Sequence, residues 1–194
     1  ASSPVNAVAT VSGGPTYAQA SGASSVKSGS LVTEIFRGFT TSALSNQTIT
    51  ITTDEDQDAV AIVISFTSTK ATSGDPDLGI GTVSVANGRG NHSASVAETA
   101  AGFMAAMVGY ETEASGHTPG SGYTEDAQVT TVAWSSGAWE TKDAEHDGTG
   151  NTTVDGTFSG TTDFAVIRVE ILSAAAASTV VRDMIGTGII PFAR

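Results

Sequence analysis

The stretch "TITITTDEDQDAVAIVISFTST", residues 48–69, contains two patterns that decide the fold class. In its first part isoleucine alternates with threonine, and Ile49 and Ile51 on one face predict a strand whose other face is solvated. Residues 58–69 are apolar on both faces for much of their length, which predicts a central strand of a sheet. The acidic residues between the two parts are typical of a turn.

The same two-residue period continues on both sides of this stretch. Short runs rich in β-branched residues are separated by glycine, asparagine, aspartate and proline, as in a chain of strands and turns. Residues 101–110 contain alanine and methionine, which favour helix, but Gly102 and Gly109 bracket the run and favour a strand. Further strands are predicted at residues 31–39, 128–134, 138–146, 152–158 and 163–172.

Glycine-rich segments connect several of these strands. Residues 135–137 (SSG) and 147–151 (DGTGN) are predicted to form hairpin turns, because they supply residues that adopt positive φ. Residues 48–66 and 152–172 share an order of Thr-rich strand, turn and apolar strand, which we interpret as two equivalent hairpins. The alanines of residues 172–185 allow a turn or two of helix after the last strand.

These strands lie at spacings of about 8–15 residues with no amphipathic helix between them, which is typical of an all-β fold. We therefore predict an antiparallel β-sandwich or jelly roll of about 8–10 strands with extended termini. The expected divisions are an N-terminal arm or edge strand (1–14), the sandwich domain (15–173) and a C-terminal extension (174–194).

The composition excludes several functional classes. The 194 residues include 20 acidic and 8 basic side chains, and a net charge of −12 repels duplex DNA and anionic membranes. No nucleic-acid partner is therefore expected. No run of eighteen apolar residues occurs, so membrane insertion is not expected either. The absence of cysteine removes disulfides, thiolate metal sites and thiol chemistry.

Two groups of residues raise the question of a metal site. The acidic run Asp54, Glu55, Asp56 and Asp58 offers oxygen ligands for Ca²⁺, but it lacks the glycine and the terminal glutamate of an EF-type loop. A solvated turn explains the run equally well. The three histidines, at positions 92, 117 and 146, have no ligand spacing between them, which leaves only a site assembled from distant strands. We predict no metal site and no cofactor.

Catalytic signatures are similarly weak, and we predict no catalytic residues. The sequence has no G-x-S-x-G nucleophile motif. Paired carboxylates that would suit a glycosidase occur among Glu111, Glu113, Glu125 and Asp126, but loops of this kind are usually solvated connections. A ligand-binding surface is the better hypothesis for this region, with aromatic and polar side chains that suit glycan or protein contact. Its candidate residues are His117, Tyr123, Trp134 and Trp139.

The acidic chain ends on an apolar segment. Burying its large side chains yields on the order of 6–12 kcal/mol gross, at ~1.5–3 kcal/mol each. Ordering about ten residues of backbone costs about 10–20 kcal/mol, so the segment needs the hydrogen bonds of a sheet edge as well. It either packs on its own sandwich, stays disordered, or adds to a partner's sheet as an assembly arm, which is our hypothesis. The residues assigned to this arm are Met184, Ile185, Ile189, Ile190, Pro191 and Phe192.

Several segments together resemble the Ser/Thr-rich β-sandwich modules of tailed-phage virion proteins, which also occur in some bacterial surface proteins. The likeness extends over about residues 13–173 and is one of strand order and composition. The segments that carry it are "GGPTYAQA" (13–20), Glu34 to Arg37, "ALSNQTITIT" (43–52), "DAVAIVISF" (58–66) and "FAVIRVEIL" (164–172).

The resemblance implies a non-enzymatic structural virion protein, most simply a capsid decoration protein located in the virion. Its expected partners are other copies of itself and a major capsid or tail protein. One alternative is a receptor- or glycan-binding module of a tail fibre or a cell-surface adhesin. A further alternative is a carbohydrate-active enzyme on a jelly-roll fold.

Overall fold

The computed structural model describes residues 8–27, 31–42, 45–53, 59–67, 69–111, 116–130, 135–174 and 181–190. These residues form an all-β antiparallel sandwich, as the alternating sequence predicts. The helical element within these ranges is a 3₁₀ turn at Pro76–Gly79, and none of the described residues forms a helix with the length and hydropathy of a membrane span.

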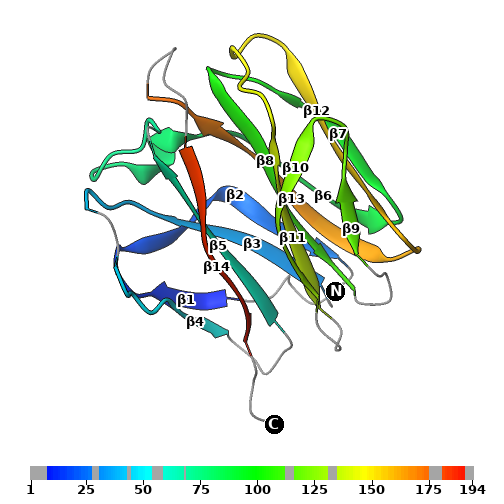
Figure 1. Ribbon diagram of the computed structural model, residues 1–194, viewed down its shortest axis with the longest axis horizontal. Helices are drawn as coiled ribbons and strands as arrows, with labels where there is room; N and C mark the ends of the chain where they lie inside the picture. The colour runs from blue at the N-terminus through cyan, green and yellow to red at the C-terminus, as the bar shows by residue number, and fades with distance from the viewer. Residues whose placement is uncertain are drawn as a thin grey trace.

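The described strands form five hydrogen-bonded sheets, in all of which neighbouring strands are antiparallel (Figure 1). The largest has the order β10 (Tyr123–Thr130), β11 (Ser136–Lys142), β8 (Gly102–Tyr110), β13 (Asp163–Leu172) and β6 (Ile80–Arg89). A three-stranded sheet has the order β7 (His92–Ala97), β12 (Asn151–Phe158) and β9 (His117–Pro119). Three two-stranded sheets pair β1 (Val8–Ser12) with β4 (Thr50–Thr53), β2 (Tyr17–Lys27) with β3 (Leu31–Gly38), and β5 (Ala59–Thr67) with β14 (Val181–Ile190).

The five-stranded sheet is the central layer, because both of its faces are covered. Along β13, the nine residues from Phe164 to Leu172 are all buried, although alternate side chains of a strand point to opposite faces. Figure 1 shows this sheet between the three-stranded sheet on the right and β2, β3, β5 and β14 on the left. The fold therefore has two cores that share one sheet.

The first core lies between the central sheet and the three-stranded sheet. Even-numbered side chains of the central strands, such as Met104, Val108 and Val166, pack against Val96 of β7 and Val154 of β12. Each of these side chains is 2% exposed or less. Burial of a large apolar side chain contributes ~1.5–3 kcal/mol, so this face is a substantial source of stability.

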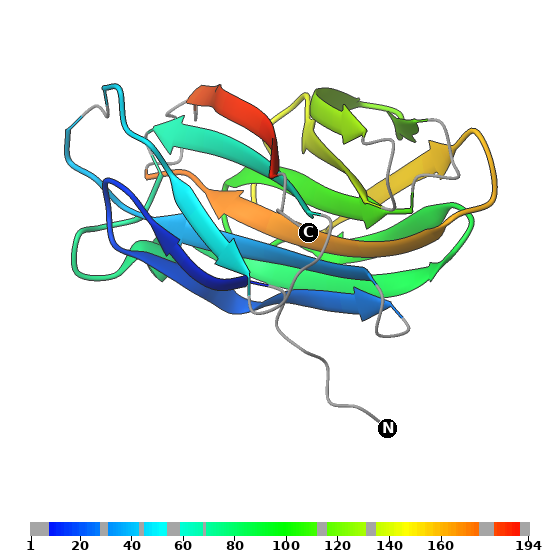
Figure 2. The ribbon, with the colours of Figure 1, turned by 90° about the horizontal axis from the view of Figure 1, so that it is seen from below.

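The second core lies on the opposite face. Odd-numbered side chains there, such as Trp139 and Val169, pack against Ile62, Ile64 and Phe66 of β5. Contacts between strands place β2 over β6, β3 over β13 and β8, β5 over β11, and β14 over β10. Figure 2 agrees with this order, since β14 (red) lies along the upper side, β2 (blue) along the lower side and β13 (orange) between them.

Most predicted strands are present, but their partners differ from those expected. Residues 102–110 form a strand rather than a helix, as predicted. The strand at residues 59–67 is not central: among the described strands β5 pairs with β14 alone, and β8 holds the middle of the large sheet. β5 is apolar for a different reason: its even-numbered side chains pack against the face of the central sheet that forms the second core.

The predicted hairpins also require correction. The first hairpin is present, because β10 pairs with β11, but its predicted turn is misplaced: Ser136 and Gly137 lie within β11, and Thr130 pairs with Ser136. The segment 147–151 does turn, with positive φ at Gly148 and Gly150, but it crosses from the central sheet to the three-stranded sheet. The two segments interpreted as equivalent hairpins are not hairpins, because β4 does not pair with β5, nor β12 with β13.

Both terminal segments, in the parts that the structure describes, pair with other strands of this chain. β1 pairs with β4 and β14 pairs with β5, so both ends contribute strands to two-stranded sheets. The helical turns considered for residues 172–185 are not found at residues 181–185, which belong to β14. Residues 175–180 lie outside the described ranges.

One buried carboxylate ties the central sheet to the loop that precedes β8. Glu170 on β13 is fully buried and accepts hydrogen bonds from the main-chain N–H groups of Thr82 (2.9 Å), Thr99 (2.8 Å) and Ala100 (3.3 Å), and from Thr99 Oγ1 (2.5 Å). Burial alone raises the pKa of a carboxyl group. These hydrogen bonds outweigh burial, so the pKa of Glu170 lies below its ordinary value.

We predict that Glu170→Gln destabilises the fold by about 1.5–3 kcal/mol, because the new amide group faces N–H and O–H donors that the carboxylate now satisfies. Urea unfolding of both proteins at pH 7 measures this difference. Glu111→Gln is the control, since a main-chain oxygen rather than the carboxylate of Glu111 accepts the hydrogen bond from Thr162. An equal loss in both variants would contradict this role.

The same variant gives a pH dependence with a defined sign. A folded-state pKa below the ordinary 4.5 means that the Glu170 contribution is fully present above pH 4.5 and is lost progressively as the pH falls from 4.5 through the lower folded-state pKa. The stability difference between wild type and Glu170→Gln therefore narrows below about pH 4.5. Urea unfolding of both proteins across this pH range measures the difference between their free energies of unfolding. A difference that stays constant or widens below pH 4.5 would contradict the lowered pKa of Glu170.

Candidate functional site

A row of polar residues crosses the face of the central sheet that forms the first core. The strand register aligns Glu125 of β10 with Glu140 of β11, Glu140 with Ala106 of β8, and Ala106 with Arg168 of β13. Glu140 and Arg168 are both completely buried. The small side chain of Ala106 separates them, and no ion pair within 4.0 Å is formed between them. Two carboxylates and one guanidinium thus face the three-stranded sheet.

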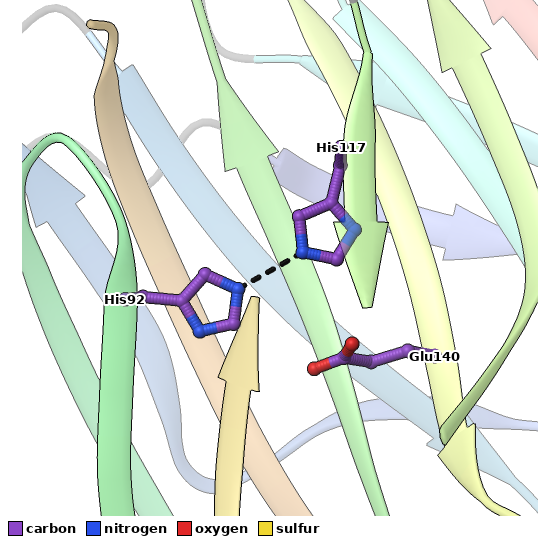
Figure 3. A group of neighbouring side chains, drawn as sticks. All are labelled: His92, His117 and Glu140. Carbon is purple, nitrogen blue, oxygen red and sulfur yellow. Dashed lines mark hydrogen bonds between the residues drawn. The ribbon is translucent and has the colours of Figure 1, made fainter. Parts of the chain in front are cut away.

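Two histidines of the three-stranded sheet meet above this row (Figure 3). His92 on β7 and His117 on β9 lie on either side of β12, and their Nε2 atoms are 3.0 Å apart with the rings nearly parallel. Gly156 of β12 is the register partner of His92 and makes this approach possible, because a Cβ atom there would overlap both Nε2 atoms. The histidines are 2% and 5% exposed, respectively.

The outer ring nitrogens of both histidines have partners. His117 Nδ1 lies 2.9 Å from Glu125 Oε2, and His92 Nδ1 lies 3.4 Å from Arg168 Nη2. Because a guanidinium can only donate hydrogen bonds, one arrangement satisfies all three contacts while both imidazoles stay neutral. In it Arg168 donates to His92 Nδ1, His92 Nε2–H donates to His117 Nε2, and His117 Nδ1–H donates to Glu125.

The electrostatics of this buried polar cluster disfavour charge on its members. Burial, followed by the positive potential of His117 and Arg168, lowers the pKa of His92 to about 3. Burial raises the pKa of Glu140 to about 8; Arg168 opposes this shift, while Asp155 and Glu125 add to it. Burial also lowers the pKa of Arg168, against the opposing effect of Glu140.

Two members of the cluster have polar atoms without a hydrogen-bond partner. Neither carboxylate oxygen of Glu140 has a hydrogen-bond partner, and neither does Arg168 Nη1. Buried polar atoms are normally paired, and an unpaired one costs about 1–3 kcal/mol or more when charged. His92 Nε2, His117 Nε2 and a carboxylate oxygen of Glu140 lie within 4.8 Å of one another, which is a separation suited to metal ligands.

The structure places the predicted ligand-binding residues in the interior rather than at an open surface. His117, Tyr123 and Trp139 are all at most 7% exposed, and Trp134 lies outside the described residues. His117 and Tyr123 belong to the first core, whereas Trp139 packs in the second core with its ring centroid 6.3 Å from that of Phe66. Strand alternation separates these side chains and buries them, so they form no common binding face.

The carboxylates considered for catalysis are also separated. Glu125 contacts His117 in the first core, whereas Asp126 accepts a hydrogen bond from Thr141 Oγ1 at 2.5 Å. Glu111 is half-buried at the end of β8, and Glu113 lies outside the described residues, as does the acidic run at positions 54–58. The two interpretations of that run, a Ca²⁺ loop or a solvated turn, therefore both stay untested.

Comparison with protein-family models, with curated proteins and with solved structures finds no match for this chain. The function is therefore inferred from the residues and their geometry.

Sequence reasoning missed the polar cluster because its members come from five strands. His92 and His117 are 25 residues apart, and Arg168 is 76 residues from His92. One feature of the sequence did indicate a buried polar site: Arg168 lies in the middle of the strand at 163–172, which is mainly apolar on both of its faces. A charged residue in a strand that is apolar on both faces must find a buried partner.

We predict that Gly156→Ala destabilises the protein by about 1–3 kcal/mol, because the added methyl group forces the two imidazoles apart. Urea unfolding measures the loss, and NMR spectra of the histidine ring nitrogens report the displacement. Gly74→Ala is the matched control, since a Cβ there has no atom within 4 Å. Unchanged ring resonances in Gly156→Ala would contradict the close approach.

Proposed function

We propose that this chain is a non-enzymatic structural protein of a virus-like particle, most simply a capsid decoration protein that docks on the major shell and on neighbouring copies. The observation that carries the proposal is the position of the C-terminal strand. Among the described strands β14 is hydrogen-bonded to β5 alone, at the border of the layer that covers the central sheet.

A strand with one neighbour presents main-chain donors and acceptors along its other edge. Such an edge accepts a strand from another chain unless it is blunted or covered. The β5 pairing also supplies the sheet hydrogen bonds that ordering of this segment requires. Of the residues assigned to the assembly arm, Met184, Ile185, Ile189 and Ile190 lie on β14, and Pro191 and Phe192 lie outside the described residues.

The described surface offers less support to the alternatives. One hollow beside β2 and β6 has a volume of about 210 Å³ and is lined by Ser21, Asp77, Ile80, Gly81 and Val83. This volume is below the ~300–1,000 Å³ of ordinary small-molecule sites. The aromatic residues on which a glycan-binding module would depend are inside the sandwich where they are described.

The first prediction from this proposal concerns copy number. A decoration protein covers a shell, so quantitative mass spectrometry of gradient-purified particles from the source culture should find hundreds of copies per particle. Recovery of a handful of copies, or recovery with the cell envelope only, would contradict decoration and favour adhesion.

The second prediction concerns the outer edge of β14. Lysine on an edge strand disfavours addition of another strand, so Val181→Lys, at a position of β14 whose register partner Thr67 is exposed, should reduce incorporation into particles at least about tenfold while the sandwich stays folded. Incorporation is measured by competition with wild-type protein on shells that lack the decoration protein, and folding by circular dichroism.

Thr52→Lys is the matched control for charge, because Thr52 is an exposed residue of β4 in a different two-stranded sheet. It should be incorporated as wild type is. Normal incorporation of Val181→Lys, or a loss confined to Thr52→Lys, would contradict docking through β14.

A further inference from the structure

We propose that His92, His117 and Glu140 bind a divalent cation of the zinc class inside the first core, where it joins β7, β9 and β11. All three side chains are buried and offer imidazole nitrogen and carboxylate oxygen, which are donors that zinc accepts. This inference is independent of the role proposed for β14, because binding is measured on the isolated protein.

The spacing of the donor atoms fits a small four-coordinate ion. With zinc–nitrogen distances of ~2.0–2.1 Å and tetrahedral angles, ligand atoms lie ~3.3 Å apart. The two Nε2 atoms are 3.0 Å apart, so a small outward movement of each ring admits the ion. The carboxylate oxygen lies within 4.8 Å of both nitrogens and has no hydrogen bond to hold it away.

Glu125 supplies the support that metal-binding histidines usually have. Its carboxylate lies 2.9 Å from His117 Nδ1 and orients the ring so that Nε2 points into the cluster. A carboxylate behind a metal-bound histidine fixes the tautomer and raises the basicity of the ligand nitrogen. Glu125 is therefore a positioning residue rather than a ligand.

The charges around the cluster also favour a cation. The carboxylates of Glu125, Asp155 and Glu140 influence one another there, and Arg168 is the cation that opposes them. A divalent ion gives the unpaired carboxyl oxygens of Glu140 the partner they lack, and it favours the ionised carboxylate over the protonated form that burial favours.

The metal competes with the neutral hydrogen-bond chain described above. Binding at His92 Nε2 requires its proton to move to Nδ1 and Arg168 Nη2 to turn away from that nitrogen. Arg168 Nε keeps its hydrogen bond to the main-chain oxygen of Val154, at 3.3 Å. The cost is thus two hydrogen bonds, the 3.4 Å bond from Arg168 and the 3.0 Å bond between the two imidazoles, against three metal–ligand bonds gained.

The test uses the full chain, freed of metal with a chelator and titrated with Zn²⁺ alone. We expect one ion per chain by calorimetry, and a rise in Tm of about 5 °C or more at a hundredfold excess over Kd. Co²⁺ in its place should give the visible absorption of a tetrahedral site. No binding and no rise in Tm for the wild-type protein would overturn the proposal.

Variants locate the ion. His117→Gln should abolish binding, and Glu125→Gln should weaken it ~10–100-fold. Where His117→Gln fails to fold, Glu140→Gln gives the same comparison at nearly unchanged volume. The matched control is His146→Gln, which removes a buried histidine that lies between Glu98 and Glu170. Loss of binding in His146→Gln, with binding retained in His117→Gln, would place the ion elsewhere and overturn the assignment.

Discussion

Burial of the central sheet on both faces is the constraint on which the rest of this structure depends. A sheet with two covered faces needs side chains that pack on both sides of every strand, and it needs two further layers to supply the cover. β13 meets the first need, with buried residues from Phe164 to Leu172. The cover is supplied by the three-stranded sheet on one face and by the strands β2, β3, β5 and β14 on the other. The arrangement gives a chain of modest size two cores, neither of which depends on disulfides.

The same constraint explains why the polar residues of the interior are so closely organised. Glu140, Arg168 and Glu170 lie on the face of the central sheet that the three-stranded sheet covers, where water cannot solvate them. Glu170 is fully satisfied by main-chain and hydroxyl donors, whereas Glu140 is not. This difference distinguishes a carboxylate that stabilises the fold from one that has capacity left for a ligand.

The sequence was sufficient for the fold class and for most strands, because alternation and turn residues are local signals. It identified strands at residues 31–39, 101–110, 152–158 and 163–172, each of which contains or nearly matches an observed strand. It was insufficient for the pairing of strands, since the residues of β5 pair with residues of β14 that lie 114 (Thr67 with Val181) to 131 (Ala59 with Ile190) positions further along the chain, and no local pattern encodes that choice. The polar cluster was lost for the same reason, because His92 and His117 meet across Gly156, and that contact exists only after β12 has been placed.

The order in which the central strands occur along the chain has a consequence for synthesis. The middle strand β8 is flanked by β11 and β13, so its second neighbour is complete only when Leu172 has been made. Until then the main-chain donors and acceptors along one edge of β8 have no partner strand. Pairing over such separations is slow compared with local structure. A chain that ends before residue 163 therefore exposes an edge of the central sheet on which strands of other chains can add.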